Sequence, residues 1–216
     1  MESVKQRKER LAAIFLILKS RYPDARLELE FKTPLDLLVA SILAAQCTDE
    51  RVNEVTGSLF EKYRAASDYA NADPALFERE IGSIPLFRKK TRSIINACKE
   101  IVLNNHGEVP SDIEALTSLK GIGRKTANLV ISSAFGKPAI VVDTHVYRIS
   151  GRLGLSAETD RDKIEFALME LLPRENWSEF GHLLATFGRD ICRARAPKCR
   201  SCPVENLCPR LNLPGD

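Results

Sequence analysis

The sequence predicts an all-α protein, and three observations support that fold class. Apolar residues recur three and four positions apart in most segments, which is the spacing of one face of an α-helix. Helix start signals, such as Thr33 followed by Pro34, precede several of these segments. Residues 139–142 have strand propensity, but no second strand-like run is available to pair with them. We therefore interpret this run as an extended connection into a helix.

Each expected helix has a start signal or an apolar face. Thr33 and Thr48 are typical N-caps, and Pro74 opens a short helix at its first position. The helix expected at 89–104 has an apolar face made of Ile94, Ile95, Cys98, Ile101 and Val102. In chain order, we expect helices at 11–18, 34–43, 49–59, from 74, at 89–104, 113–119, 125–135, from 144, at 160–172 and at 177–189.

The overall charge does not by itself indicate a nucleic-acid-binding protein. The 216 residues, enough for one large domain or two small ones, include 32 basic and 29 acidic side chains, a net charge of +3. Basic residues nevertheless cluster at 88–92, at 124–125 and between 189 and 200. A single run of this kind usually marks a solvated helix face. Three runs, each beside another functional signal, make contacts with a nucleic acid more plausible than one run would.

The N-terminal region has a basic start and a short apolar stretch, 11–18, which superficially resembles a signal peptide. Acidic residues interrupt the basic start, basic residues follow the apolar stretch directly, and no cleavage site of small residues is visible. The apolar run at 37–45 is far shorter than the roughly 20 residues needed to cross a bilayer. We expect a soluble, intracellular protein of the cytoplasm with no membrane contact, associated with the nucleoid in a bacterium or archaeon.

Two glycines flank one apolar residue at Gly121, Ile122 and Gly123, between two segments of helical spacing. This pattern predicts a helix, a tight hairpin and a second helix over 113–136. The exposed amides of the hairpin and of the following helix N-terminus would form an anion site suited to a DNA phosphate, with Arg124 beside it. The alternative is an ordinary helix–helix turn.

Lys125 lies in the first turn of the second helix of this pair. A cation there opposes the helix dipole, which favours negative charge. The same field, together with partial burial, would favour the neutral amine that a nucleophilic lysine requires. Asp143 follows the 139–142 run and is expected to cap the next helix. Its carboxylate could also stabilise positive charge or transfer a proton, but sequence spacing does not show that Lys125 and Asp143 meet.

Four cysteines follow a C-x6-C-x2-C-x5-C pattern near the C-terminal end: Cys192, Cys199, Cys202 and Cys208. Thiolates so close together in an intracellular protein indicate a metal site, which could hold tetrahedral zinc or an iron–sulfur cluster. Cys47 and Cys98 stand apart and are expected in the core. The loop between the first two cysteines of the pattern carries three basic residues suited to phosphate contacts: Arg193, Arg195 and Lys198.

Leu119 to Asn128, read as L-K-G-I-G-R-K-T-A-N, and the following V-D-T-H at 142–145 closely resemble the endonuclease III family of bifunctional DNA glycosylases. The resemblance extends roughly from residue 25 onward. It implies that Lys125 attacks C1′ of a damaged nucleotide, forms a Schiff base and cleaves the strand by β-elimination. It also implies that Asp143 is the catalytic aspartate and that the four cysteines bind a [4Fe-4S] cluster. The implied partner is double-stranded DNA with an oxidised pyrimidine or an abasic site, bound by a monomer.

A base inside a duplex must be flipped out before such chemistry. Residues 45–49 resemble the family segment whose glutamine enters the vacated space, which points to Gln46. Residues 84–88 resemble the loop that supplies an apolar wedge, which makes Leu86 the candidate unless it is simply a core residue. Pro85 departs from the family pattern here, as Lys120 does in the hairpin. His145 either contacts DNA or packs between helices.

The resemblance also implies two domains with an active-site cleft between them. One is a six-helix barrel at 26–137 that contains the helix-hairpin-helix. The other combines 1–25 with 138–216 and holds the cluster. The alternatives within the superfamily are adenine and thymine mismatch glycosylases, which Lys125 disfavours. The alternative from another class is a DNA-binding module without catalysis.

Overall fold

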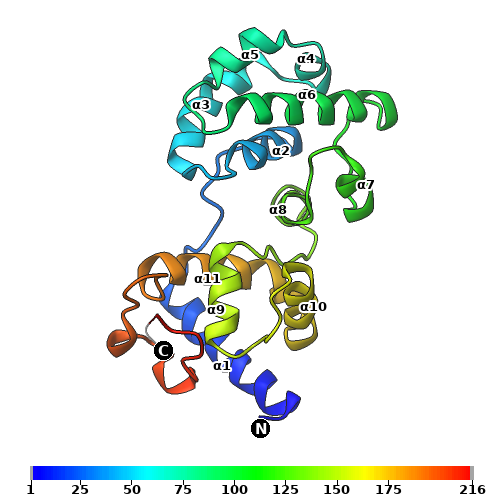
Figure 1. Cartoon of the computed structure of the whole chain (residues 1–216). Helices are drawn as coiled ribbons and strands as arrows, with labels where there is room; N and C mark the ends of the chain where they lie inside the picture. The colour runs from blue at the N-terminus through cyan, green and yellow to red at the C-terminus, as the bar shows by residue number, and fades with distance from the viewer. Residues whose placement is uncertain (1, 215–216) are drawn as a thin grey trace. The chain divides into compact units, whose positions relative to one another are not determined.

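The structure is a computed structural model that describes residues 2–214. Its regular elements in that range are α-helices and short 3-10 turns, without strands (Figure 1). The chain divides into two compact units, Glu28–Lys137 and Met1–Leu27 together with Pro138–Asp216. The predicted all-α fold class is confirmed.

The unit Glu28–Lys137 consists of consecutive helices joined by short connections. They are α2 (Pro34–Leu43), α3 (Asp49–Lys62), α4 (Ala66–Ala70), α5 (Pro74–Glu80), α6 (Phe87–Asn104), α7 (Ile113–Ser118) and α8 (Arg124–Ala134). Helix α2 packs against α3, α6 and α8, and nearly all of its residues are buried. This central position explains its unbroken apolar sequence.

The predicted starts of α2, α3 and α5 are confirmed. Thr33 accepts the amide of Asp36, whose carboxylate in turn accepts the amide of Thr33, so the two residues form a capping box at α2. Thr48 caps α3, and Asp73 precedes Pro74 as the cap of α5. The single-turn helix α4 was not predicted, because five residues are too few to display helical spacing.

Helix α6 differs from its prediction in two respects. It begins at Phe87, two residues before the expected start. Val102 is 41% exposed and does not belong to the buried face, whereas Lys90 and Thr91 do belong to it. Successive residues of a helix are about 100° apart, so Val102 turns away from the face that Ile101 occupies.

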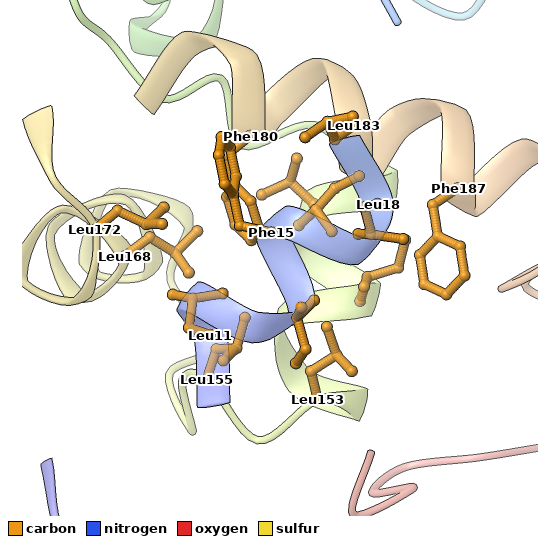
Figure 2. Packing of buried hydrophobic residues seen from close by; sticks show 14 of the residues in the cluster. Leu11, Phe15, Leu18, Leu153, Leu155, Leu168, Leu172, Phe180, Leu183 and Phe187 are labelled. Atoms are coloured by element: carbon orange, nitrogen blue, oxygen red, sulfur yellow. The ribbon is translucent and has the colours of Figure 1, made fainter. Parts of the chain in front are cut away.

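The second unit packs four α-helices around one hydrophobic core. They are α1 (Val4–Arg21), α9 (Thr144–Arg152), α10 (Arg161–Leu171) and α11 (Trp177–Asp190), joined by the 3-10 turns η1 (Arg174–Asn176), η2 (Cys199–Ser201) and η3 (Glu205–Leu207). Figure 2 shows Leu11, Phe15 and Leu18 of α1 among leucines and phenylalanines of α10, α11 and the connections that follow α9 and α10. The rings of Phe15 and Phe180 lie 6.4 Å apart between centroids.

The N-terminal apolar stretch is part of helix α1 and faces this core. Ser3 and Gln6 form a capping box at its start, and Leu11, Ile14 and Leu18 have no exposed surface. Burial against the core therefore accounts for these apolar residues, as predicted. Among the described residues, no helix combines the length and apolar character needed to cross a membrane.

The apolar run at 139–142 is an extended connection from α8 to α9, as predicted. Ile140 and Val142 are buried in the core of the second unit. The backbone of Ala139 bonds to the Ser178 hydroxyl of α11 through its amide, at 3.4 Å, and through its carbonyl, at 3.3 Å. Core burial thus explains the β-branched residues, and this connection leads directly to Asp143.

Candidate active site

The two glycines between α7 and α8 have different structural roles. Gly121 has a φ of +94°, and a Cβ added there would lie 3.1 Å from the Ser93 hydroxyl oxygen of α6. Gly123 is the N-cap of α8 with a φ of −90°, and no atom lies within 4 Å of its added Cβ. Ile122 between them is buried. The hairpin is therefore held to the unit by Ile122 and by the close approach of Gly121 to α6.

The Gly121→Ala variant is expected to lose about 1–3 kcal/mol of unfolding free energy, because alanine is strained at this φ and contacts Ser93. Gly123→Ala is the matched control, because its backbone is ordinary and the space beside it is open. It should cost less than about 1 kcal/mol, from the poorer N-cap alone. Urea unfolding of both variants measures the difference. Equal losses would show that the hairpin does not need glycine at 121.

Lys120 fastens the hairpin in a second way. Its backbone amide donates to Glu100 Oε2 of α6 at 2.9 Å. Proline, which the resemblance leads one to expect at this position, has no N–H and could not make this bond. Lys120, where the family pattern has proline, therefore allows a hydrogen bond to Glu100 that proline would not.

Lys125 lies in the first turn of α8, and its side chain is exposed. The first turn contains no acidic residue, and its N-cap is a glycine without a side chain. The amides of this turn therefore lie beside a cation, as the sequence predicted. The partial burial expected for Lys125 is therefore not found, because its side chain is exposed.

Gln46 and Leu86 are both exposed residues in the left-handed backbone region. Gln46 follows α2 with a φ of 57°, and Leu86 is the N-cap of α6 with a φ of 59°. Such values are uncommon outside glycine, and strained positions of this kind concentrate at functional sites. Leu86 is 54% exposed, so the alternative that it is a core residue is wrong.

Asp143 is the N-cap of α9, as predicted. Its Oδ1 accepts the amides of His145 and Val146, each at 2.8 Å. Both cap bonds use the same oxygen, so Oδ2 is not engaged in the cap. The side chain is half-buried. A carboxylate fixed in this way can present one oxygen to a substrate without losing its structural bond.

Two arginines connect α9 to the cysteine-containing segment. Arg148 Nη2 donates to the Cys192 carbonyl at 2.9 Å. Arg152 is 3% exposed and donates to the Arg193 carbonyl at 2.7 Å and to the Ala194 carbonyl at 3.0 Å. The helix that Asp143 begins is thus held to the start of the cysteine loop by five-donor guanidinium groups.

The four cysteines of the C-x6-C-x2-C-x5-C pattern line one cavity, together with Arg152, Phe187 and Val204. Burial raises the pKa of the Cys202 thiol to about 11 and also raises the pKa of Cys208. Buried thiolates therefore need a positive partner. Residues 2–214 contain no group of three or more His, Cys, Asp or Glu side chains arranged to hold one metal ion. The thiols are instead distributed around the cavity.

The basic residues of the cysteine loop differ in their contacts. Arg193 Nε donates to the carbonyls of Arg189 and Asp190 at the end of α11, at 3.2 and 3.1 Å. Lys198 Nζ lies 3.4 Å from Asp190 Oδ1. All three residues that are predicted to contact phosphates, Arg195 included, are exposed. Arg193 and Lys198 therefore also fasten the loop to α11.

His145 packs against α11. A Cβ added to Gly188 would lie 2.6 Å from His145 Nδ1, and Arg148 Nη2 lies 3.2 Å from the same nitrogen. The side chain is half-buried. These contacts support a helix-packing role for His145.

The predicted site residues are divided between the two units. The glycines, Arg124, Lys125, Gln46 and Leu86 belong to Glu28–Lys137, whereas Asp143, His145 and the cysteines belong to the other unit. Sequence reasoning missed Lys90, Arg148 and Arg152 as candidates. Lys90 stands four residues before Ile94 of the apolar face of α6, a spacing that places it on the same buried face.

The two cysteines outside the C-x6-C-x2-C-x5-C pattern differ in their burial. Cys98 is buried, as expected, but Cys47 is only half-buried in the connection between α2 and α3, so its expected place in the core is wrong. All six cysteines have free thiols.

Comparison with known proteins finds relatives along nearly the whole chain. The family described as HhH-GPD superfamily base excision DNA repair protein matches residues 39–174. Endonuclease III of Synechocystis sp. is 46% identical over 210 residues, which cover 97% of this chain and 96% of the relative. Endonuclease III of Bacillus subtilis is 46% identical over 188 residues, with coverage of 87% and 86%.

Solved structures with a similar fold include DNA complexes. A structure of a trapped endonuclease III–DNA covalent intermediate has a TM-score of 0.90 at 44% identity and covers 94% of this chain and 96% of that chain. A thermostable thymine-DNA glycosylase has a TM-score of 0.84 at 23% identity, with the same coverage of 94% and 96%. At this lower identity, the likeness concerns the fold alone.

Proposed function

Because the chain belongs to the endonuclease III family of the HhH-GPD superfamily, we propose that it excises oxidised pyrimidines from DNA, with Lys125 as the nucleophile. The protein is a base excision DNA glycosylase and abasic-site lyase with the helix-hairpin-helix glycosylase fold, and its partner is DNA. One observation carries the proposed role of Lys125. A two-glycine hairpin presents this lysine, exposed, in the first turn of a helix without acidic residues.

In the proposed reaction, the neutral amine of Lys125 attacks C1′ of the damaged nucleotide. The nitrogen–C1′ bond forms, and the bond from C1′ to the base breaks, so that the base leaves with the electron pair and a proton. One proton then leaves the attacking nitrogen. The C1′–O4′ bond breaks with its electron pair going to O4′, which takes up a proton, and the C1′=N double bond forms, so that the sugar ring opens to a protonated Schiff base. Loss of a C2′ proton then expels the 3′ phosphate, which nicks the strand on the 3′ side.

The amine must be neutral for the first step. Deprotonating an ordinary lysine at pH 7 costs about 4.6 kcal/mol. DNA that covers the exposed side chain would take the amine out of water, which disfavours its charged form. The reactive state of Lys125 is therefore proposed to form with DNA bound.

Asp143 is proposed to stabilise positive charge on the sugar and to accept a proton, through the oxygen that the cap leaves unengaged. Asp143→Asn keeps an N-cap, because asparagine is as good a cap as aspartate. It is expected to lower the rate of base release by about 10²–10⁴-fold without loss of stability. Asp143→Ala should lose the same activity and, in addition, about 1 kcal/mol of unfolding free energy.

Single-turnover base release and urea unfolding of both variants separate the two roles. If Asp143→Asn retained full activity while Asp143→Ala lost it, Asp143 would be a cap alone.

We propose that Cys192, Cys199, Cys202 and Cys208 hold a [4Fe-4S] cluster. Support comes from their shared cavity and from the burial that disfavours free thiolates. A bound cluster would supply the iron charge that balances these four thiolates. Arg152 lies 3.5 Å from Cys192 Sγ through its Nη1 and adds a positive charge beside the cavity. In this proposal the site fixes the loop and performs no step of the reaction.

We also propose two sets of contacts with DNA phosphates. One is made by the cysteine loop through Arg193, Arg195 and Lys198, and the other by the hairpin through Gly121, Gly123 and Arg124. Gln46 and Leu86 are proposed to enter the duplex. Free thiols and a DNA substrate further suit an intracellular location.

A panel of duplexes tests this function. Each duplex carries one lesion, namely an oxidised pyrimidine, an abasic site, an adenine mismatch or a thymine mismatch, and base release and strand cleavage are measured separately. The proposal predicts release of oxidised pyrimidines and cleavage at the abasic site. Release of a mismatched base without cleavage would favour a monofunctional glycosylase, and binding with neither activity would leave a DNA-binding module.

A further inference from the structure

Lys90 is a buried lysine that the proposed chemistry does not use. It lies in the first turn of α6 and is 4% exposed. Its ammonium donates to the carbonyl oxygens of Leu43, at 2.8 Å, and of Ala45, at 2.6 Å. Charge-assisted bonds of this length are strong, so Lys90 fastens α6 to the end of α2.

The two carbonyls belong to the turn that precedes Gln46. A helix leaves its last four carbonyls without partners within the helix, and α2 ends at Leu43. The Ala45 carbonyl is part of the same planar peptide unit as the Gln46 amide. The bond from Lys90 therefore sets the orientation of the backbone from which Gln46 projects, with its φ of 57°.

The same residue also holds the backbone of Leu86. The amide of Lys90 donates to the Leu86 carbonyl at 3.1 Å, which is the first helical bond of α6. Leu86 stands one turn before Lys90, as the left-handed N-cap of this helix. One residue thus bonds through its amide to the Leu86 segment and through its side chain to the Gln46 segment.

Packing alone does not explain a lysine at this position, because burying its charge is unfavourable. Burial lowers the pKa of the Lys90 ammonium, and the nearby Cys47 thiol acts in the opposite direction. A buried charge is favoured only where strong hydrogen bonds offset its desolvation, and an apolar side chain of similar length would avoid that cost. The bonds to the α2 turn are what lysine adds.

We infer that Lys90 is a positioning residue for base extrusion, which holds the Gln46 and Leu86 segments in one fixed arrangement so that both side chains enter the duplex together. The inference rests on the proposed function, in which Gln46 and Leu86 replace the flipped nucleotide. It predicts that loss of Lys90 impairs extrusion of a paired base and leaves the lyase chemistry intact.

The test compares two substrates for the Lys90→Met variant. One is a duplex with a paired oxidised pyrimidine, which must be extruded. The other is single-stranded DNA with an abasic site, which needs no extrusion. The single-turnover rate on the duplex is expected to fall about 10- to 100-fold, the loss that follows a misplacement of about 1 Å. The rate on the single strand should stay within about twofold of the unchanged protein.

Lys89→Met is the matched control, because Lys89 is the adjacent lysine and its side chain is exposed. It should lose similar activity on both substrates through its charge alone. If Lys90→Met does not fold, Lys90→Arg replaces it, because arginine keeps the charge and the donors but changes their geometry. Lys90→Arg is then expected to lower the rate on the duplex and not on the single strand, by a smaller factor than Lys90→Met.

A double-mutant cycle shows whether Lys90 acts through the two side chains. In a Gln46→Ala, Leu86→Ala background, Lys90→Met should cause little further loss on the duplex, because the groups it positions are gone. Equal losses on both substrates, or a full further loss in that background, would overturn the inference. Failure of the unchanged protein on both substrates would instead overturn the proposed function.

Discussion

Replacing Lys125 with glutamine is expected to lower strand cleavage at an abasic site by at least about 10³-fold, because the variant has no nucleophilic amine. Glutamine is close to lysine in length and uncharged, so α8 should form normally and even gain from the loss of a cation at its N-terminus. The measurement is single-turnover cleavage together with the unfolding free energy in urea.

Lys120→Gln is the matched control for this experiment. Lys120 is an exposed lysine of the same hairpin whose structural contact is made by its backbone amide, which the substitution preserves. It should retain cleavage and weaken DNA binding modestly, in a salt-dependent way. A Lys125→Gln protein that cleaved as fast as this control would exclude Lys125 as the nucleophile.

Serine in place of Cys202 is expected to remove iron and to cost at least about 3 kcal/mol of unfolding free energy, because metal binding energy contributes to folding. The segment around η2 and η3 packs against the core of its unit through Val204, Leu207, Cys202 and Cys208, so two of the four proposed ligands take part in this packing. Loss of the metal should therefore also lower affinity for DNA. Iron and sulfide content, visible absorption and urea unfolding measure these effects.

Cys47→Ser is the control, since Cys47 lies outside the pattern, in the connection after α2. It should retain iron, colour and stability. If the protein were colourless and contained stoichiometric zinc that was lost in Cys202→Ser, the four cysteines would form a zinc site and not a cluster site.

Local signals in the sequence were sufficient to predict most helices. Caps such as Thr33, Thr48 and Asp143 act within one turn, so their residues alone indicate where α2, α3 and α9 begin. The same holds for the extended run at 139–142, whose lack of a pairing partner was visible in the sequence. Five-residue α4 was missed because a single turn has no periodicity to detect.

Contacts between distant residues were beyond this reasoning. The basic run 88–92 was interpreted as a candidate for DNA contact, yet Lys90 is buried against carbonyls some 45 positions away in the chain. Its spacing from Ile94 was the available signal. Arg148 and Arg152 likewise bond across more than 40 positions to the cysteine loop, and only the folded core brings these groups together.

One predicted feature of Lys125, the partial burial of its side chain, is not found in the structure. Sequence reasoning expected partial burial, whereas the side chain is exposed at the start of α8. The field of the helix is local and could be predicted, but desolvation depends on what covers the residue. The exposure of Lys125 therefore depends on distant parts of the chain and could not be predicted from its neighbours in the sequence.

The most direct test of the central claim is the position of the covalent bond. The protein is incubated with DNA that contains an abasic site, the Schiff base is reduced with borohydride, and the adduct is digested and sequenced by mass spectrometry. We expect the deoxyribose remnant on Lys125, in the peptide that begins α8. A remnant on Lys120 or Lys90 instead, or cleavage without any trapped adduct, would contradict the assignment.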